Sequence, residues 1–293
     1  MNVRRLLAAA VLVGAATAPA AAQSWRTFSA QRALGREDSL RVVVAYGLGK
    51  FVLRAAPPAT LYDIALRYDA DVFRAEKHYD AATHTLRVGA DSATAVRFTF
   101  SSKNLHPGGS SGRAEQGTMA LALAPGIPLD LTVELGIAEA SFDFGGLWVD
   151  RAHIEAAMGA AKISFPTANV HPMRELSIEA TLGGLEIDHL GNARAQHVTI
   201  DAALGGGVVD LRGDWTGEMT VTLSSTLGGF HISAPTDAGV RINATTRLSG
   251  MTAKGFTQRG NEYYSPNYDS AKRKITIDAK ATLAGYEIGW VAP

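Results

Sequence analysis

A strand pattern repeats along the second half of the chain, with apolar residues at alternate positions on both sides of a small residue. LSIEATLGGLEID, residues 176–188, is a clear copy, preceded by HIEAAMGAAKIS and followed by VTIDAALGGGVVD. Alternation of apolar and polar residues predicts strands with one buried face. The small residue recurs at spacings of 23, 24, 22, 23, 21 and 35 residues, and its positions are Gly136, Gly159, Gly183, Gly205, Gly228, Ser249 and Ala284.

A period of about 22 residues indicates one structural unit that repeats by stacking. Each unit is expected to consist of two or three short strands bent at the glycine, where the lack of a Cβ allows a tight corner. The predicted fold is therefore all-β, a β-solenoid of about seven short rungs. A β-sandwich of hairpins is the alternative, but it gives no reason for glycines in phase.

Three aliphatic columns accompany the small residue and are expected to form the buried ladder of the solenoid. Five places before it stand Leu131, Ile154, Ile178, Ile200 and Leu223. One place before it stand Leu135, Met158, Leu182, Leu204, Leu227, Leu248 and Leu283. Four places after it stand Ile163, Ile187, Val209, Ile232 and Ile288.

Residues 1–22 have the pattern of a signal peptide, because a basic start and an apolar run end in the alanines Ala20 to Ala22. An uncleaved membrane anchor is the alternative. The mature protein is thus expected to be exported, either periplasmic or extracellular, and no later apolar run is long enough to span a bilayer.

The mature chain divides into four predicted parts. Residues 23–38 form an N-terminal arm, and residues 39–105 form an N-terminal β-domain that caps the open edges of the solenoid. Residues 106–117, HPGGSSGRAEQG, have the composition of a loop or linker. Residues 118–293 form the solenoid, with one insertion, GFTQRGNEYYSPNYDSAKRK, between Gly255 and Lys274.

Charge and cysteine content exclude several classes of partner and binding site. Loss of Arg4 and Arg5 with the leader leaves 26 basic against 28 acidic side chains, which gives no reason to expect nucleic acid as a partner. The absence of cysteine excludes disulfides and thiolate metal sites. The histidines show no metal-binding spacing, no serine lies in a GxSxG motif, and Gly47-Leu48-Gly49-Lys50 lacks the third glycine of a dinucleotide site. No cofactor is therefore expected.

Two stretches resemble a known family of bacterial envelope proteins. The C-terminal run, with YYSPNYDSA at 263–271 and a strand leading into AGYEI, resembles the C-terminal domain of LiaF-like proteins, the cell-wall-active antibiotics response proteins. YGLGKFVL and LYDIALRYDADVF resemble the N-terminal module of the related toast-rack family. The resemblance implies an envelope protein with a β-solenoid and a role in the response to envelope damage. LiaF-like proteins carry transmembrane helices ahead of the β-domain, whereas only a signal peptide is expected there in this chain.

Two sets of side chains are candidates for binding. Tyr263, Tyr264 and Tyr268 lie in the insertion and either form an interaction surface or cap the last rung. Glu155, Glu179 and Asp201, four places before the corner, are expected to stack on neighbouring strands. That column is either an ordinary solvated face or a calcium site. It is also where a carbohydrate-active β-helix enzyme would place its carboxylates.

The preferred prediction is a non-enzymatic exported β-solenoid that acts through protein or envelope contacts. An envelope or membrane protein is the expected partner. The alternatives are a carbohydrate-active enzyme that uses the carboxylate column and an adhesin-like protein that binds surfaces.

Overall fold

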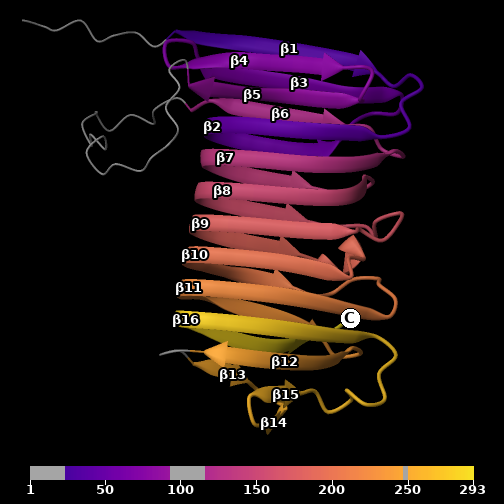
Figure 1. The fold of residues 1–293 in the computed structure, drawn as a ribbon, viewed down its shortest axis with the longest axis vertical. Coiled ribbons are helices and arrows are strands. Elements are labelled where there is room, and N and C mark those ends of the chain that lie inside the picture. The colour runs from indigo at the N-terminus through magenta and orange to yellow at the C-terminus, as the bar shows by residue number, and fades with distance from the viewer. Residues whose placement is uncertain (1–23, 93–115, 247–249) are drawn as a thin grey trace, which may run out of the picture.

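The computed structural model describes residues 24–92, 116–246 and 250–293. The predicted signal peptide (1–22), nearly all of the predicted linker (106–117), and Leu248 with Ser249 lie outside these residues. The described chain forms one sheet of 16 strands (Figure 1). Its helical content is one short 3-10 helix, η1 (Leu190–Ala193). The all-β prediction is confirmed.

Seven long strands form the body of the molecule and pair in parallel with one another. Each turns at one edge of the molecule, on the left in Figure 1, so that its second half runs behind its first half. In spatial order they are β2 (Leu40–Ala55), β7 (Pro128–Asp143), β8 (Trp148–Ser164), β9 (Glu175–Asp188), β10 (His197–Asp210), β11 (Glu218–Pro235) and β16 (Lys274–Val291).

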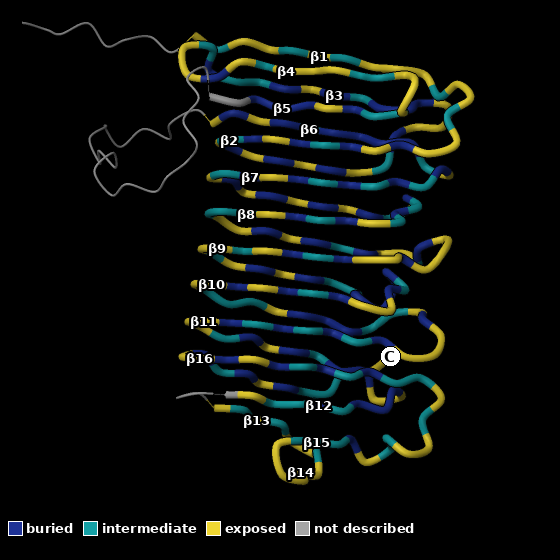
Figure 2. The backbone as a smooth tube through the Cα atoms, viewed as in Figure 1, coloured by how far each residue is buried: buried dark blue, intermediate teal, exposed yellow. Residues whose placement is uncertain are grey.

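The core lies between the two layers of half-strands, because alternate side chains of each layer point inward. Buried and more exposed residues accordingly alternate along the long strands (Figure 2). Two of the predicted aliphatic columns are buried in this core, as expected. Ile154, Ile178 and Ile200 from the column five places before the bend are at most 1% exposed, and Ile163 and Ile187 from the column four places after it are fully buried. Stacking in register thus gives each strand the apolar neighbours that a single strand lacks.

Glycines occupy the bend of most of the long strands. Gly159, Gly183, Gly205 and Gly228 have φ between 128° and 147°, a conformation that L side chains avoid. A Cβ on each would overlap a backbone carbonyl oxygen of the preceding strand in the stack. These four predicted corners therefore lie where the sequence placed them.

The predicted corner at Gly136 is wrong by two residues. Leu135 pairs with Ala156 and Ile137 with Met158, so Ala138 lies beside Gly159 and takes the bend position. Gly136 instead lies beside the carbonyl oxygen of Gly47. Because side chains alternate with a period of two, a slip of two residues keeps the same face inward, and spacing alone did not distinguish the two registers.

The column directly before the bend is not part of the core, contrary to expectation. Leu182 is 40% exposed and Leu283 is 51% exposed, with Leu204 and Leu227 between these values. The chain turns around the end of the flattened core at this point, so a side chain just before the turn points away from both layers. We call the edge that carries these residues the bend edge.

Five further strands cover the N-terminal end, above β2 in Figure 1. The two halves of β2 pair in parallel with β5 and β6, and antiparallel strands lie beyond them. The predicted N-terminal arm, residues 23–38, contains a nine-residue edge strand. The five are β1 (Trp25–Ala33), β3 (Thr60–Asp69), β4 (Phe73–Asp80), β5 (Thr85–Ser92) and β6 (Thr118–Leu123).

The C-terminal end departs from the order of the sequence. The last strand, β16, lies between β11 and two shorter strands, β12 (Gly239–Thr246) and β13 (Met251–Ala253), that precede it in the chain. The predicted insertion contains the small antiparallel strands β14 (Thr257–Arg259) and β15 (Glu262–Tyr264), which extend the sheet beyond β12. Since the strand order at this end does not follow the order of the sequence, a regular solenoid of seven rungs remains a proposal.

Asparagines secure the edge opposite the bends. Asn192 donates from Nδ2 to the carbonyl oxygen of Phe165 (2.8 Å) and accepts from the amide of Asp214 (2.8 Å). Asn169 bonds both backbone groups of Val149 in the same manner. Both side chains are buried, so each satisfies backbone groups that would otherwise lack a partner.

Asp210, at the end of β10, makes stability depend on pH. Burial acts to raise the pKa of this carboxyl, but Arg212 bonds it from both its side chain and its backbone amide, and the net pKa lies below the usual value. A lowered pKa in the folded state stabilises the protein above the unfolded value near 3.9, and this contribution is lost as pH falls through the folded pKa.

We therefore expect Asp210→Asn to lower the melting temperature at neutral pH and to flatten its decline at acidic pH. Thermal unfolding of both proteins between neutral pH and pH ~2 measures this. Parallel curves for the two proteins would contradict the role given to Asp210.

Candidate functional site

The predicted carboxylates stack as expected on the outward face of the first half-strands. Glu155, Glu179 and Asp201 are paired in register on β8, β9 and β10. The corrected register of β7 adds Glu134, which pairs with Glu155. Four neighbouring strands therefore each present one acidic side chain, and we call this column the acidic ladder. Beyond it the same column continues with Ser224 and Lys280.

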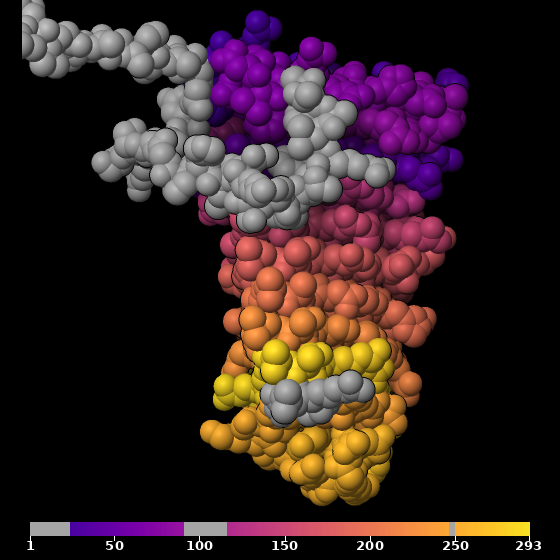
Figure 3. All heavy atoms as spheres, turned by 60° about the vertical axis from the view of Figure 1, so that its left-hand side comes forward, coloured from indigo at the N-terminus to yellow at the C-terminus, as the bar shows by residue number. Residues whose placement is uncertain are grey.

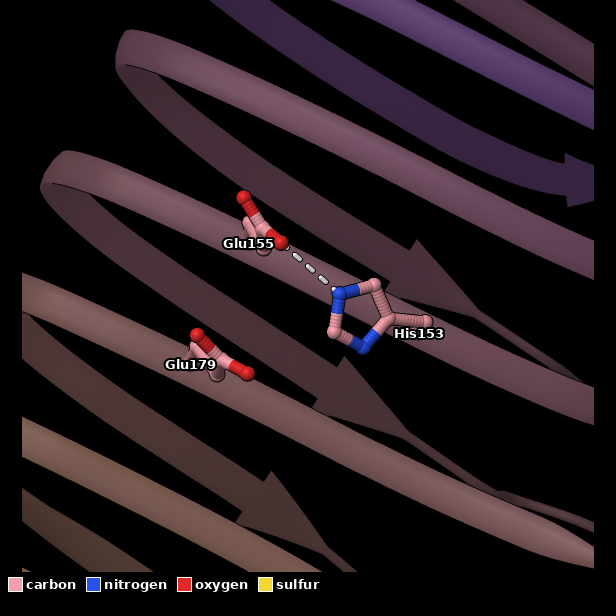
Figure 4. A group of neighbouring side chains, drawn as sticks. All are labelled: His153, Glu155 and Glu179. Atoms are coloured by element: carbon pink, nitrogen blue, oxygen red, sulfur yellow. Dashed lines mark hydrogen bonds and ion pairs between the residues drawn. The ribbon is translucent and has the colours of Figure 1, made fainter.

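A histidine, His153, lies beside two carboxylates of the acidic ladder, Glu155 and Glu179 (Figure 4). His153 stands two residues before Glu155 on the same face of β8, and its Nε2 lies 2.8 Å from a carboxylate oxygen of Glu155. Ligand atoms of His153, Glu155 and Glu179 all lie within 4.8 Å of one another. Histidine spacing alone does not reveal this cluster, but the i, i+2 spacing of His153 and Glu155 on a strand places both side chains on one face.

These three side chains offer one nitrogen and two oxygen ligands to a cation. Ca²⁺ takes 6–8 oxygen ligands, whereas imidazole with carboxylates is typical of Zn²⁺. The cluster is open to solvent, with 49% of the Glu155 side chain and 37% of the His153 side chain exposed. The donors therefore fit a weak site for Zn²⁺ better than the predicted calcium site.

Asp201 lies outside this cluster and lines a neighbouring surface groove of about 200 Å³. Glu179 borders both, since it belongs to the cluster and to the groove wall. The other outward side chains of the groove are short and polar or small, namely Thr181, Ala203, Ser224 and Thr226.

Substitutions distinguish the cluster of His153, Glu155 and Glu179 from the predicted set of Glu155, Glu179 and Asp201. We expect Zn²⁺ titrated into the protein to bind at one site, measured by calorimetry, and Glu179→Gln or His153→Gln to abolish the heat. Asp201→Asn is the matched control and should leave binding unchanged. Loss of binding in Asp201→Asn would favour the originally predicted set, and no heat in any protein would leave the acidic ladder as a solvated face.

The predicted tyrosines lie at the C-terminal end of the molecule and differ from one another. Tyr263 packs against the hydrophobic core. Tyr264 and Tyr268 form an edge-to-face pair with ring centroids 5.2 Å apart. The Tyr264 hydroxyl donates to Glu262 (2.6 Å), a bond that raises the pKa of the phenol.

Cations lie over both rings of the pair. The Arg259 guanidinium is 5.0 Å from the centre of the Tyr264 ring, and the Lys274 ammonium is 4.9 Å from that of Tyr268. The structure thus splits the predicted trio into one capping residue and two partly exposed rings within a cationic rim. We call Tyr264 and Tyr268 the tyrosine pair.

No helix in the described ranges is long and apolar enough to cross a membrane. No protein-family model matches the chain, and no curated protein matches it in sequence. The resemblance to toast-rack and LiaF-like proteins therefore stays a prediction.

Solved structures similar to this chain include suspected adhesion proteins. One is a suspected cell adhesion protein from Clostridium sporogenes, with 14% identity, a TM-score of 0.46, and coverage of 91% of this chain and 100% of that one. A suspected adhesin from Bacteroides fragilis has 8% identity, a TM-score of 0.32, and coverage of 89% and 97%. A third, from Parabacteroides merdae, has 9% identity, a TM-score of 0.31, and coverage of 90% and 96%. At this level of similarity these structures assign no ligand or activity to the chain.

Proposed function

We propose that this protein is a non-enzymatic, exported β-solenoid that acts by contacting other molecules of the cell envelope. The seven long parallel strands with bends in register support the solenoid, and the signal-peptide pattern of residues 1–22 supports export. The tyrosine pair is the observation that carries the binding role.

Tyr264 and Tyr268 suit a contact surface for physical reasons. Each joins a large apolar ring to a polar hydroxyl and loses little side-chain entropy when it is covered. Both are half-buried, so their position is fixed before a partner arrives. Arg259 and Lys274 add a polar rim of the kind that surrounds the apolar centre of interfaces.

Variants at the tyrosines test the proposal against a purely capping role. Residues 23–293 are incubated with sedimented envelope fragments, and bound protein is measured together with its melting temperature. We expect the double variant Tyr264→Ser/Tyr268→Ser to lose binding at an unchanged melting temperature. Tyr263→Ser is the matched control and should lower the melting temperature instead. A double variant that binds normally but unfolds earlier would show that the pair only caps β12.

A carbohydrate-active enzyme is the second candidate, and the groove beside Glu179 and Asp201 favours it. The general acid of a glycosidase is normally enclosed by apolar groups, whereas both carboxylates here are exposed. Glycan turnover that disappears in Glu179→Gln or Asp201→Asn would establish this candidate in place of the first.

A further inference from the structure

An exposed aliphatic ladder runs along the bend edge over the whole stack. Its residues directly precede the bend on the seven long strands and pair with one another in register. Met158 is half-buried, and the other six are between 40% and 51% exposed. The bend-edge ladder consists of Leu48, Ile137, Met158, Leu182, Leu204, Leu227 and Leu283.

A continuous apolar strip of this kind is uncommon on a monomer and marks a contact surface. The side chains around it from β8 to β16 are small and uncharged, so nothing in this section resists being covered. Figure 3 turns this edge toward the viewer, and the long strands toward the C-terminal end follow one another along it as horizontal bands of colour. Before the bend the flanking residues are Ala157, Thr181, Ala203, Thr226 and Thr282, and after it they are Ala160, Gly184, Gly206, Gly229 and Gly285.

A groove lies beside the ladder, on the outward face just after the bend. It has a volume of about 660 Å³ and crosses β2, β7, β8, β9 and β10. On β8, β9 and β10 the small residues Ala160, Gly184 and Gly206 line it next to the bend. Its lining also includes two ion pairs, Lys50 with Glu139 and Lys162 with Glu186. Ladder and groove therefore run parallel to each other along the same edge.

The fold itself gives no reason for glycine at Gly184. Its φ lies outside the left-handed region, and a Cβ built on it would meet no atom within 4 Å. At Gly285 the nearest atom would be the carbonyl oxygen of Gly250, 3.6 Å away, which is an ordinary contact. Because glycine weakens a strand, such positions indicate close approach by another backbone or a ligand.

We propose that the bend edge binds a second copy of this chain. In a two-fold arrangement with its axis along the stack, the ladder of each copy lies over the groove of the other, with its central residues over Ala160, Gly184 and Gly206. Both copies have the same strand spacing of about 4.8 Å, so one contact in register brings the others into register. A two-fold interface must be self-complementary, and an adjacent ridge and groove satisfy that condition.

The size of the edge predicts a weak dimer. Seven strands span about 30 Å and four residues about 13 Å, which gives roughly 400 Å² on each copy. The total of about 800 Å² lies below the usual size of specific interfaces. We therefore expect a dissociation constant in the micromolar range or above, and a dimer that forms only at high concentration.

Sedimentation velocity over a wide range of protein concentration tests the inference, which does not rest on binding by the tyrosine pair. We expect the wild-type chain to dimerise, and Leu204→Gln and Gly184→Gln to remain monomeric with unchanged melting temperatures. Val170→Gln, which replaces an exposed apolar residue away from the bend edge (58% exposed), is the control and should still dimerise.

Three results would overturn the inference. The first is a wild-type chain that stays monomeric at every concentration. The second is a dimer that survives both Leu204→Gln and Gly184→Gln. The third is a monomer that binds phosphatidylcholine vesicles through Leu204, since the ladder would then contact lipid rather than a second copy.

Discussion

Gly183→Ala will destabilise the protein severely, whereas Gly184→Ala, one residue further along, will be tolerated. Gly183 has a φ of 147°, and a Cβ there would overlap the carbonyl oxygen of Gly159 on the adjacent strand. Backbone strain and forced displacement each cost about 1–3 kcal/mol. At Gly184 the added methyl group has free space and an ordinary backbone conformation.

Thermal and denaturant unfolding of the two variants at low protein concentration measures the difference. A loss of about 3 kcal/mol or more corresponds to a fall in melting temperature on the order of 6–12 °C for a chain of this size. Gly184→Ala should lie within ~1 kcal/mol of the wild type. Equal effects at both positions would show that the bend does not depend on the stacked register described above.

Phe142→Ala will destabilise both ends of the molecule together. Phe142 on β7 is 1% exposed, and its ring centroid lies 5.3 Å from that of Phe51 on β2 and 6.0 Å from that of Phe144. Removal of a buried Phe ring costs about 3–5 kcal/mol. Because β2 belongs to the predicted N-terminal domain and pairs along its length with β7, we expect a single unfolding transition to shift as a whole.

Calorimetry distinguishes this outcome from independent unfolding of two bodies. Phe142→Leu is the matched control, since it keeps most of the volume and should cost less than about 1.5 kcal/mol. Two transitions, of which the substitution moves only one, would show that residues 39–105 fold as a separate unit despite the shared sheet.

Local periodicity predicted much of the fold. The bends at Gly159, Gly183, Gly205 and Gly228 and the buried columns around Ile178 and Ile187 follow from patterns that each strand carries within itself. Few other sequence patterns suit a strand that must bury one face and bend at a fixed position.

Pairing between distant strands could not be predicted in the same way. The slip of two residues at Gly136 preserves the alternation of apolar and polar positions. The sequence pattern therefore does not reveal that Glu134 pairs with Glu155 in the acidic ladder. The position of β16 between β11 and β12 depends on contacts across 30 residues or more, which no local pattern records.

The candidate site was predicted in part for the same reason. Glu155, Glu179 and Asp201 were identified because they share one column, but the neighbour of Glu155 along its own strand, His153, was overlooked. The ladder through Leu204 was assigned to the core because apolar character alone does not say on which side of a bend a side chain lies. Its exposure became evident only from the three-dimensional path of the chain.

Binding to the envelope without catalysis can be measured by mixing residues 23–293 with isolated envelope fragments. Depletion of the protein from solution and release of soluble sugars or peptides are measured in the same samples. We expect saturable binding, with no release of sugars or peptides above that from fragments alone. Release of products would instead show an enzyme, and a protein that stays in solution at every fragment concentration would show that it does not bind the envelope.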